Sequence, residues 1–232
     1  MAVKNDLGWY GKLPTAGDFL LRRMPQALID SWSHWFQLGL AHWHHPHDGT
    51  TDPFSRAPIW NFALPATLGV QRVQIGCMMP SRDRVGRAWP LLVIQSVPVK
   101  AWHPAQLSIS GEWFQELGAT MNQAIQQMHS ADWLEQALRG IPPLSLPDTG
   151  RSDIMDVIGY QDLPCTLAWR EVATRFDPLQ YTSYWWTNQS DGYPLASHKH
   201  SGNLTAQLFS QLFHPAAGSL SGRHGLYPPM FE

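Results

Sequence analysis

The chain has 232 residues, with 16 basic and 18 acidic side chains and a formal net charge of −2. This near-neutral balance argues against a general nucleic-acid-binding protein, which needs a strongly basic surface. A chain of this length buries enough apolar surface to fold without disulfides or metal, and its two cysteines form no C-x-x-C pair. No apolar run approaches the roughly 18 residues of a membrane span, so we expect a cytoplasmic protein with reduced thiols.

The first predicted elements, in chain order, are a strand, a turn and a helix. Gly8–Pro14 is typical of a short strand and Thr15–Asp18 of a turn, while Phe19–Arg23 fits either a strand or a loop. A helix is predicted from Pro25 onward, because proline suits a first helical turn and apolar residues then recur at helical spacing. The apolar face comprises Leu28, Trp32, Trp35, Gly39 and Trp43.

The next segments predict a loop followed by three strands. His44–Pro58 is polar and is predicted to be a loop, and Ile59–Leu64 alternates loosely, as a strand does. Val73–Met79 and Leu91–Val99 are apolar runs of the length expected for buried strands. The charged residues between these two runs therefore lie on a loop held by two rigid elements.

Two helices are predicted after the last of these strands. The first spans Ser110–Met128, with Ser110 as its candidate N-cap, and the second runs from Asp132 to Gly140. Leu144–Pro178 shows no clear periodicity, so the sequence predicts no particular element there.

The C-terminal part predicts one more strand and one more helix. Tyr181–Thr187 is rich in aromatic residues and threonine, which favours a strand. Leu204, Leu208 and Leu212 mark a last helix, with Asn203 as its candidate cap, and residues 214–232 form an irregular tail. Because no clear linker interrupts this mixture of strands and helices, we expect one domain over residues 1–232, of the α/β class around a mixed sheet.

The loop Pro80–Pro90, called the arginine loop below, concentrates three arginines and Asp83 within six positions of a chain that is only 15% charged. Two roles are open for it. Asp83 and the flanking arginines could hold the loop in place by ion pairs, with Gly86 supplying an unusual backbone angle. Alternatively, Arg84 or Arg87 recognises a protein or an anion, and the two roles are compatible.

A histidine cluster, formed by His42, His44 and His47, suggests a competing function. Its spacing resembles the H-x-H-x-D-H motif of metallo-β-lactamase-like hydrolases, with Pro46 where the motif has aspartate. The cluster follows a helix rather than a strand, which favours a solvated helix end over a metal site. A metal-dependent hydrolase is therefore the alternative function, and no metal site is our expectation.

Other catalytic signatures are incomplete. Gly218–Gly222 has Leu220 where a nucleophile elbow needs serine, and no G-x-G-x-x-G or phosphate-binding loop is present. Asp18, Ser81 and Asp83 could form a polar site, but the sequence does not fix the distances among them. We therefore expect a protein that is not an enzyme and that has no cofactor.

The pair Trp185 and Trp186 belongs to a chain with 12 tryptophans. On a strand, neighbouring side chains point to opposite faces, so one ring is expected in the core. The other ring then lies under a helix or is an exposed contact residue, as tryptophan is enriched at binding hot spots.

Three segments, taken in order, form a recognisable set. They are Gly8-Trp9-Tyr10-Gly11-Lys12-Leu13-Pro14-x-x-Gly17-Asp18-Phe19-x-x-Arg22-x-Met24-Pro25, Pro80-Ser81-x-Asp83-x-Val85-Gly86-Arg87-x-x-Pro90-Leu91 and Ser183-x-Trp185-Trp186. This set resembles the motifs of the TagF (ImpM) family of type VI secretion system proteins. The departures are Ala16, where a polar residue is common, and Trp89, where phenylalanine is expected; residues 98–180 carry little recognisable signal.

The resemblance implies a three-layer αβα sandwich and a cytoplasmic accessory protein that represses assembly or firing of the secretion apparatus after translation. It also implies a partner, the forkhead-associated-domain scaffold of the same system, and leaves the oligomeric state open. The candidate partner-binding or motif residues are Lys12, Gly17, Asp18, Arg22, Arg23, Ser81, Asp83, Arg84, Gly86, Arg87, Trp185 and Trp186.

Overall fold

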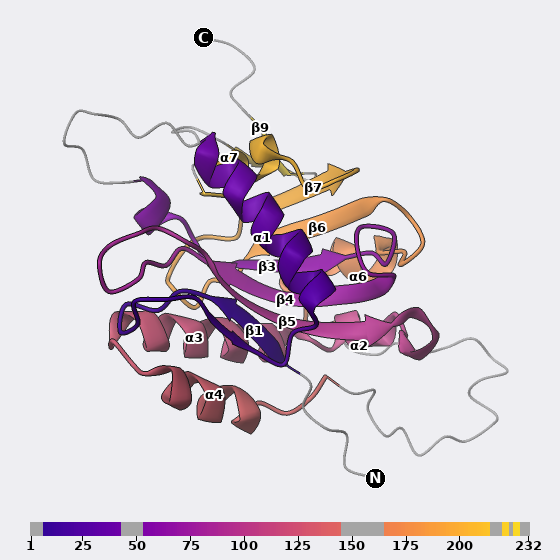
Figure 1. The fold of residues 1–232 in the computed structure, drawn as a ribbon. Helices are drawn as coiled ribbons and strands as arrows, with labels where there is room; N and C mark the ends of the chain where they lie inside the picture. The colour runs from indigo at the N-terminus through magenta and orange to yellow at the C-terminus, as the bar shows by residue number, and fades with distance from the viewer. Residues whose placement is uncertain (1–6, 43–52, 145–164, 214–219, 223–224, 228–232) are drawn as a thin grey trace, which may run out of the picture.

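The computed structural model describes residues 7–42, 53–144, 165–213, 220–222 and 225–227 (Figure 1). Its centre is a seven-stranded sheet in the order β2-β1-β5-β4-β3-β6-β7. The strands are β1 (Gly8–Gly11), β2 (Leu20–Arg22), β3 (Trp60–Leu64), β4 (Arg72–Met79), β5 (Leu91–Pro98), β6 (Thr182–Thr187) and β7 (Ser197–Ser201).

Every neighbouring pair in this sheet is antiparallel, so the prediction of a mixed sheet was wrong. For the pairs that follow one another along the chain, the reason is the connections: short links join β3 to β4, β4 to β5 and β6 to β7, whereas a parallel pair needs a long crossover. The predicted α/β class itself is confirmed.

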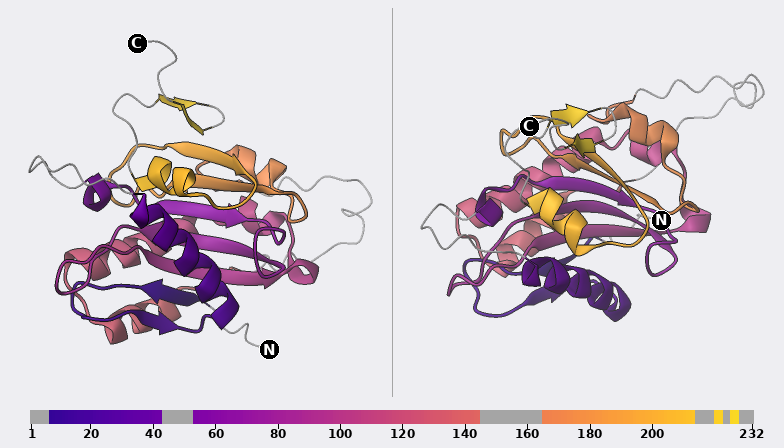
Figure 2. Two further views of the ribbon diagram at one scale, coloured as in Figure 1. Left: turned by 45° about the horizontal axis from the view of Figure 1, so that its top comes forward. Right: turned by 90° about the horizontal axis from the view of Figure 1, so that it is seen from above.

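Helices cover both faces of the sheet, as Figures 1 and 2 show. One face carries α1 (Gln26–Ala41) and α7 (Ala206–Phe213), and the other carries α3 (Gly111–Gln126) and α4 (Ala131–Gly140). The smaller helices α2 (Ala105–Ser108) and α6 (Arg170–Arg175) contribute to the core beneath α3 and α4. The sheet therefore lies between two helical layers.

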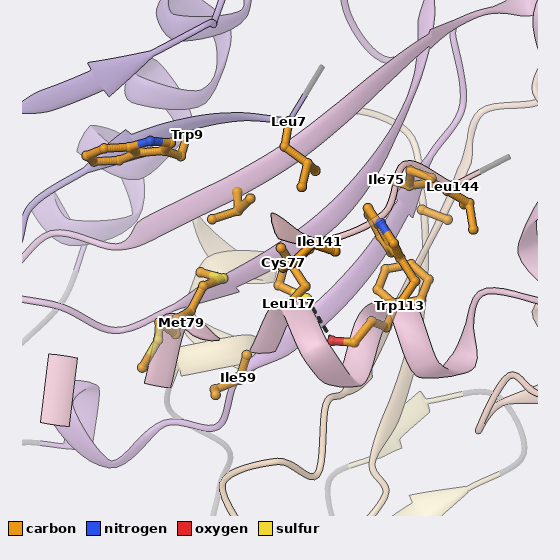
Figure 3. Packing of buried hydrophobic residues seen from close by; sticks show 14 of the residues in the cluster. Leu7, Trp9, Ile59, Ile75, Cys77, Met79, Trp113, Leu117, Ile141 and Leu144 are labelled. Carbon is orange, nitrogen blue, oxygen red and sulfur yellow. Dashed lines mark hydrogen bonds between the residues drawn. The ribbon is translucent and has the colours of Figure 1, made fainter. Parts of the chain in front are cut away.

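Each face of the sheet has its own hydrophobic core, because successive strand residues point in opposite directions. Cys77 belongs to the core beneath α3 and Met78, its neighbour on β4, to the core beneath α1. Figure 3 shows the first of these cores, in which Trp113 and Leu117 of α3 lie close to the strands. No helix in the described part of the chain combines the length and apolarity that a bilayer span requires.

The apolar stripe of α1 packs as predicted, and Leu28, Trp32 and Trp35 are buried. Gly39 lies against α7, where a Cβ atom would come within 2.1 Å of the Phe209 ring. The stripe's last predicted member, Trp43, lies outside the described residues. The close contact of α1 with α7 thus depends on a residue without a side chain.

The two predicted helix caps have different outcomes. Ser110 occupies the N-cap position of α3, as predicted, but its hydroxyl donates to the carbonyl oxygen of Leu107 at 2.7 Å and caps no backbone N–H. The Gly111 N–H donates instead to Thr166 Oγ1 at 3.0 Å. At α7 the prediction of Asn203 was wrong, because the capping oxygen belongs to Thr205, which accepts from the Leu208 N–H at 3.1 Å. Spacing alone does not select between these two polar residues.

Three segments with weak sequence signals have regular structure. Phe19–Arg23 contains the edge strand β2, and the predicted loop His44–Pro58 contains a short 3-10 helix, η1 (Pro53–Arg56). A second one, η2 (Val99–Ala101), follows β5. Within residues 214–232, predicted to be irregular, β8 (Leu220–Gly222) pairs antiparallel with β9 (Gly225–Tyr227).

Candidate functional site

The arginine loop connects β4 to β5 at one end of the sheet, and Asp83 lies at its centre with only 3% of its surface exposed. One carboxylate oxygen, Oδ1, accepts hydrogen bonds from the backbone N–H groups of Val85 (3.1 Å) and Arg87 (2.9 Å). The other, Oδ2, accepts from Lys12 Nζ at 3.0 Å and Arg87 Nε at 2.6 Å. Such charge-assisted bonds are the strongest class of hydrogen bond in proteins.

The same network joins the arginine loop to the segment that follows β1. Arg87 Nη2 donates to the carbonyl oxygen of Gly17 at 2.7 Å, and the Arg84 N–H donates to that of Ala16 at 2.8 Å. Ser81 Oγ donates to the carbonyl oxygen of Lys12 at 2.7 Å. Residues from two motifs far apart in the sequence therefore form one structural unit.

Electrostatics keep Asp83 ionised. Burial alone would raise the pKa of its carboxyl group, but the hydrogen bonds from the Arg87 backbone and from the side chains of Lys12 and Arg87 outweigh burial. The pKa of Asp83 is consequently well below its usual range. The prediction that ion pairs hold the loop is confirmed for Asp83, and Gly86 has the expected unusual backbone angle, with φ of 88°.

The tip of the arginine loop is exposed, in contrast to the buried network around Asp83. Val85 is 69% exposed and Arg84 is exposed beside Gly17. Within residues 7–42, 53–144 and 165–213, the Arg84 guanidinium makes no hydrogen bond or ion pair. The Arg84 N–H nevertheless donates to the Ala16 carbonyl and the Val85 N–H to the Asp83 carboxylate, so the tip presents a charged and an apolar side chain on a rigid support.

A hollow of about 590 Å³, called the groove below, lies beside this tip. It is bordered by the arginine loop, η1, the end of α3 and the turn around Asp191. Its cationic lining comprises Arg56, Arg82 and Arg84, and its apolar lining includes Met79, Ile125 and Met128. An open site that combines positive charge with apolar surface suits an anionic segment that also carries an apolar side chain.

Two of the groups around the groove are already held by the protein. Arg82 donates from Nε to Ser55 Oγ at 3.0 Å and from Nη1 to the Gly86 carbonyl oxygen at 2.8 Å. The Asp191 carboxylate accepts from the Ile59 N–H at 2.9 Å. In contrast, the exposed Arg56 side chain, like that of Arg84, has no partner among the described residues.

Three candidate residues lie in or beside β2, and within the described ranges only one of them is held by other parts of the chain. Arg23 donates from Nε to the Leu7 carbonyl oxygen at 2.8 Å and forms an ion pair with Glu135 of α4, so it fixes the end of the strand. Burial favours a raised pKa for Glu135, but hydrogen bonds from Trp9, Arg23 and a neighbouring arginine lower it instead. Asp18 and Arg22 are exposed on the surface.

Trp185 and Trp186 are both in the core, with 0% and 1% of their surface exposed. Trp185 packs in the core beneath α1, and Trp186 in the core beneath α3, with its ring centroid 4.8 Å from that of Phe114. Of the two alternatives left open for the second ring, burial under a helix is confirmed and an exposed contact residue is wrong, because helices cover both faces of β6.

Of the histidine cluster, only His42 is described. It is exposed at the end of α1, with Nδ1 2.9 Å from the Leu38 carbonyl oxygen, while His44 and His47 lie outside the described residues. Among the residues that the structure describes, no three histidine, cysteine or acidic side chains are grouped so that they could hold a metal ion.

One buried polar cluster was not predicted from the sequence. Asn188 donates from Nδ2 to Asn61 and, at 2.6 Å, to the Phe114 carbonyl oxygen, while Cys77 Sγ lies 3.0 Å from Asn61 Oδ1. Burial raises the pKa of the Cys77 thiol well above its ordinary value, despite the hydrogen bond from Asn188. A thiol in this state is a poor nucleophile.

Comparison with known proteins relates the first two of the three motif-bearing segments to one family. A family model described as the TagF N-terminal domain, type VI secretion system-associated, matches residues 8–141, which is more than half of the chain. Among solved structures, the crystal structure of PA0076 from Pseudomonas aeruginosa PAO1 has a TM-score of 0.69 and 22% sequence identity, covering 96% of this chain and 98% of that one. No curated protein matches the sequence.

Proposed function

Because the chain belongs to the TagF family of type VI secretion system-associated proteins, we propose that it is a non-enzymatic negative regulator of the secretion apparatus. It acts in the cytoplasm after translation, by binding a protein needed for assembly or firing. The partner is the forkhead-associated-domain scaffold of the same secretion system, and the contact surface is the arginine-loop tip together with the groove.

The observation that carries this proposal is the contrast between the buried base and the exposed tip of the arginine loop. Asp83 and Lys12 are buried and paired with each other, whereas Arg84 and Val85 project from a backbone held by the Ala16 carbonyl and the Asp83 carboxylate. Side chains on a rigid support lose less conformational entropy on binding, so each contact contributes more to affinity. Buried ion pairs of this kind support a recognition loop without touching the partner.

The charges around the groove indicate what the partner presents. Arg56 and Arg84 offer two guanidinium groups on the border of a hollow that also has apolar lining. Arginine binds carboxylates through two parallel hydrogen bonds and is enriched at binding hot spots. We therefore assign to the scaffold an acidic segment, with at least one apolar side chain, as the part that enters the groove.

The chemistry of the site supports a binding function rather than catalysis. The Ser81 hydroxyl donates to a backbone carbonyl, the Asp83 carboxylate accepts four hydrogen bonds, and the Cys77 thiol has a raised pKa. An activated nucleophile instead needs a neighbouring base or a lowered pKa. In the described part of the chain, these reactive groups serve structural roles.

The experiment compares scaffold binding by charge-reversal variants of matched charge change. Arg84→Glu and Arg56→Glu alter the groove, whereas Lys100→Glu alters an exposed lysine at the opposite end of β5. With the purified scaffold, isothermal titration calorimetry should show Kd values raised about tenfold or more for each groove variant. The Lys100→Glu variant should bind like the wild type.

The regulatory part of the proposal needs a cellular measurement. Deleting the gene should raise secretion by the type VI system, and the wild-type chain or Lys100→Glu should restore repression when supplied in trans. Arg84→Glu should fold, as judged by an unchanged thermal midpoint, and fail to repress. Unchanged scaffold affinity of both groove variants would refute the assigned surface, and unchanged secretion in the deletion strain would refute repression.

A further inference from the structure

The segment Asp18–Arg22 has no role in the groove, although it belongs to the first sequence motif. It contains β2, the terminal strand of the sheet, which lies beside β1 at the indigo edge in Figure 1. Two of its apolar side chains are exposed, Phe19 at 47% and Leu21 at 46%. Edge strands expose unpaired backbone groups to which another strand can add.

The order of residues along this edge is self-complementary. An acidic residue, Asp18, and a basic residue, Arg22, lie at equal distances on either side of Leu20. When two copies of the segment run antiparallel and pair about Leu20, Asp18 of each copy faces Arg22 of the other, and Phe19 faces Leu21. Opposite charges and aromatic–aliphatic pairs across strands are both stabilising.

We propose that the β2 edge is a homodimer interface, in which residues Asp18–Arg22 of two copies pair antiparallel about Leu20 to form one continuous sheet. Leu20 is the first residue of β2, so the pairing extends this strand by two residues, from Leu20 back through the bend at Asp18. The two copies are related by a two-fold symmetry axis, so each contributes the same surface. Leu21 and Tyr10 are cross-strand partners within one copy, so the exposed Phe19 and Leu21 lie on the α1 side of the sheet. In the dimer these two apolar side chains of each copy cover those of the other.

The hydrogen bonding of Arg22 shows how the edge can open. In one copy, Arg22 Nη1 donates to the Leu21 carbonyl oxygen at 2.9 Å, and the guanidinium lies 5.8 Å from the Trp9 ring. A backbone N–H of the second copy replaces this donor at Leu21. The guanidinium is then released to bind Asp18 of the second copy, which has no partner within the described residues of its own chain.

The same charges could instead protect the edge, since charged residues on edge strands commonly discourage pairing. Here, however, the order of Asp18 and Arg22 gives opposite charges in the antiparallel register, so pairing brings attraction between the copies. The interface is small, with about five residues from each copy, so we expect a dimer with a Kd in the micromolar range or weaker.

Sedimentation velocity of the full chain, over about 1 µM to 1 mM, measures this equilibrium. Asp18→Arg places arginine opposite arginine, and Arg22→Asp places aspartate opposite aspartate, so each variant alone should dimerise roughly tenfold to 100-fold more weakly. An equimolar mixture of the two variants should dimerise like the wild type, because every pair across the interface is again of opposite charge. Glu116→Arg, an exposed position on α3, is the control with the same charge change as Asp18→Arg and should have no effect.

Each outcome decides the proposal. Both single variants lie on the surface, and circular dichroism checks that they fold, so loss of dimer cannot be attributed to unfolding. A wild-type chain that stays monomeric throughout the concentration range overturns the proposal. Single variants that dimerise like the wild type place the interface elsewhere, and failure of the mixture to recover overturns the pairing about Leu20.

Discussion

Replacing Trp186 tests whether the pair Trp185 and Trp186 has a structural role or contacts a partner. The Trp186 side chain is 1% exposed and packs edge-on against Phe114, between the sheet and α3. Truncating a fully buried tryptophan to alanine costs about 3 to 5 kcal/mol, a large fraction of the roughly 5 to 15 kcal/mol that stabilises a typical protein. For a chain of this length, that loss lowers the thermal midpoint by about 6 to 20 °C.

Urea unfolding followed by circular dichroism measures the change in the free energy of unfolding for Trp186→Ala. The matched control is Tyr181→Ala, which removes an aromatic ring that is 63% exposed just before the same strand and should change stability by less than about 0.5 kcal/mol. Trp186→Phe keeps most of the packing and should give an intermediate loss. A Trp186→Ala variant that loses less than about 1 kcal/mol yet no longer binds the scaffold would refute the assignment of Trp186 to the core.

Three further predictions concern the loop, a buried histidine and metal content. Gly86→Ala should lower the free energy of unfolding by about 1 kcal/mol in urea titrations. The φ of Gly86 is 88°, which strains any other residue, whereas no atom lies within 4 Å of an added Cβ, so backbone strain is the whole cost. An unchanged free energy of unfolding would show that the loop relaxes freely. Burial, together with the nearby His200, lowers the pKa of His198 to about 4. Between pH values of about 4 and 6.5 the unfolded chain therefore binds a proton that the folded chain excludes. The free energy of unfolding should fall by up to roughly 3 kcal/mol as the pH drops from about 6.5 to 4, and His198→Leu should remove this pH dependence. An unchanged pH dependence in the variant would contradict the prediction. Protein purified without a histidine tag should contain no stoichiometric zinc by elemental analysis, whereas bound zinc that is lost when the histidine cluster is replaced by alanine would favour the hydrolase.

Periodicity predicted the elements whose burial is decided locally. The stripe of α1 predicts a helix with one buried face, and the continuous apolar runs of β4 and β5 predict strands that are buried on both faces. The burial of both Trp185 and Trp186 could not be predicted in the same way. It depends on helices covering both faces of the sheet, which is a property of the whole fold.

The arginine loop shows a second limit of sequence-based inference. The ion pair between Asp83 and Arg87 is local, since the partners are four positions apart, and it was one of the two predicted roles of the loop. The partner Lys12 lies 71 positions away, and it reaches Asp83 only because β1 is inserted beside β5. Sheet order therefore decides which charges remain free at the surface, and spacing along the chain does not.

The first sequence motif divides at Gly17 into an inward part and an outward part. Lys12 lies against Asp83 and the Gly17 carbonyl accepts from Arg87, so this part holds the arginine loop and the groove in place. Asp18 and Arg22 lie beyond that network, on the exposed edge. If the two parts act independently, Arg84→Glu should lose scaffold binding while dimerising normally, and Asp18→Arg should lose the dimer while a single copy still binds the scaffold. A variant of either part that abolished both activities would show instead that the edge and the groove form a single interface.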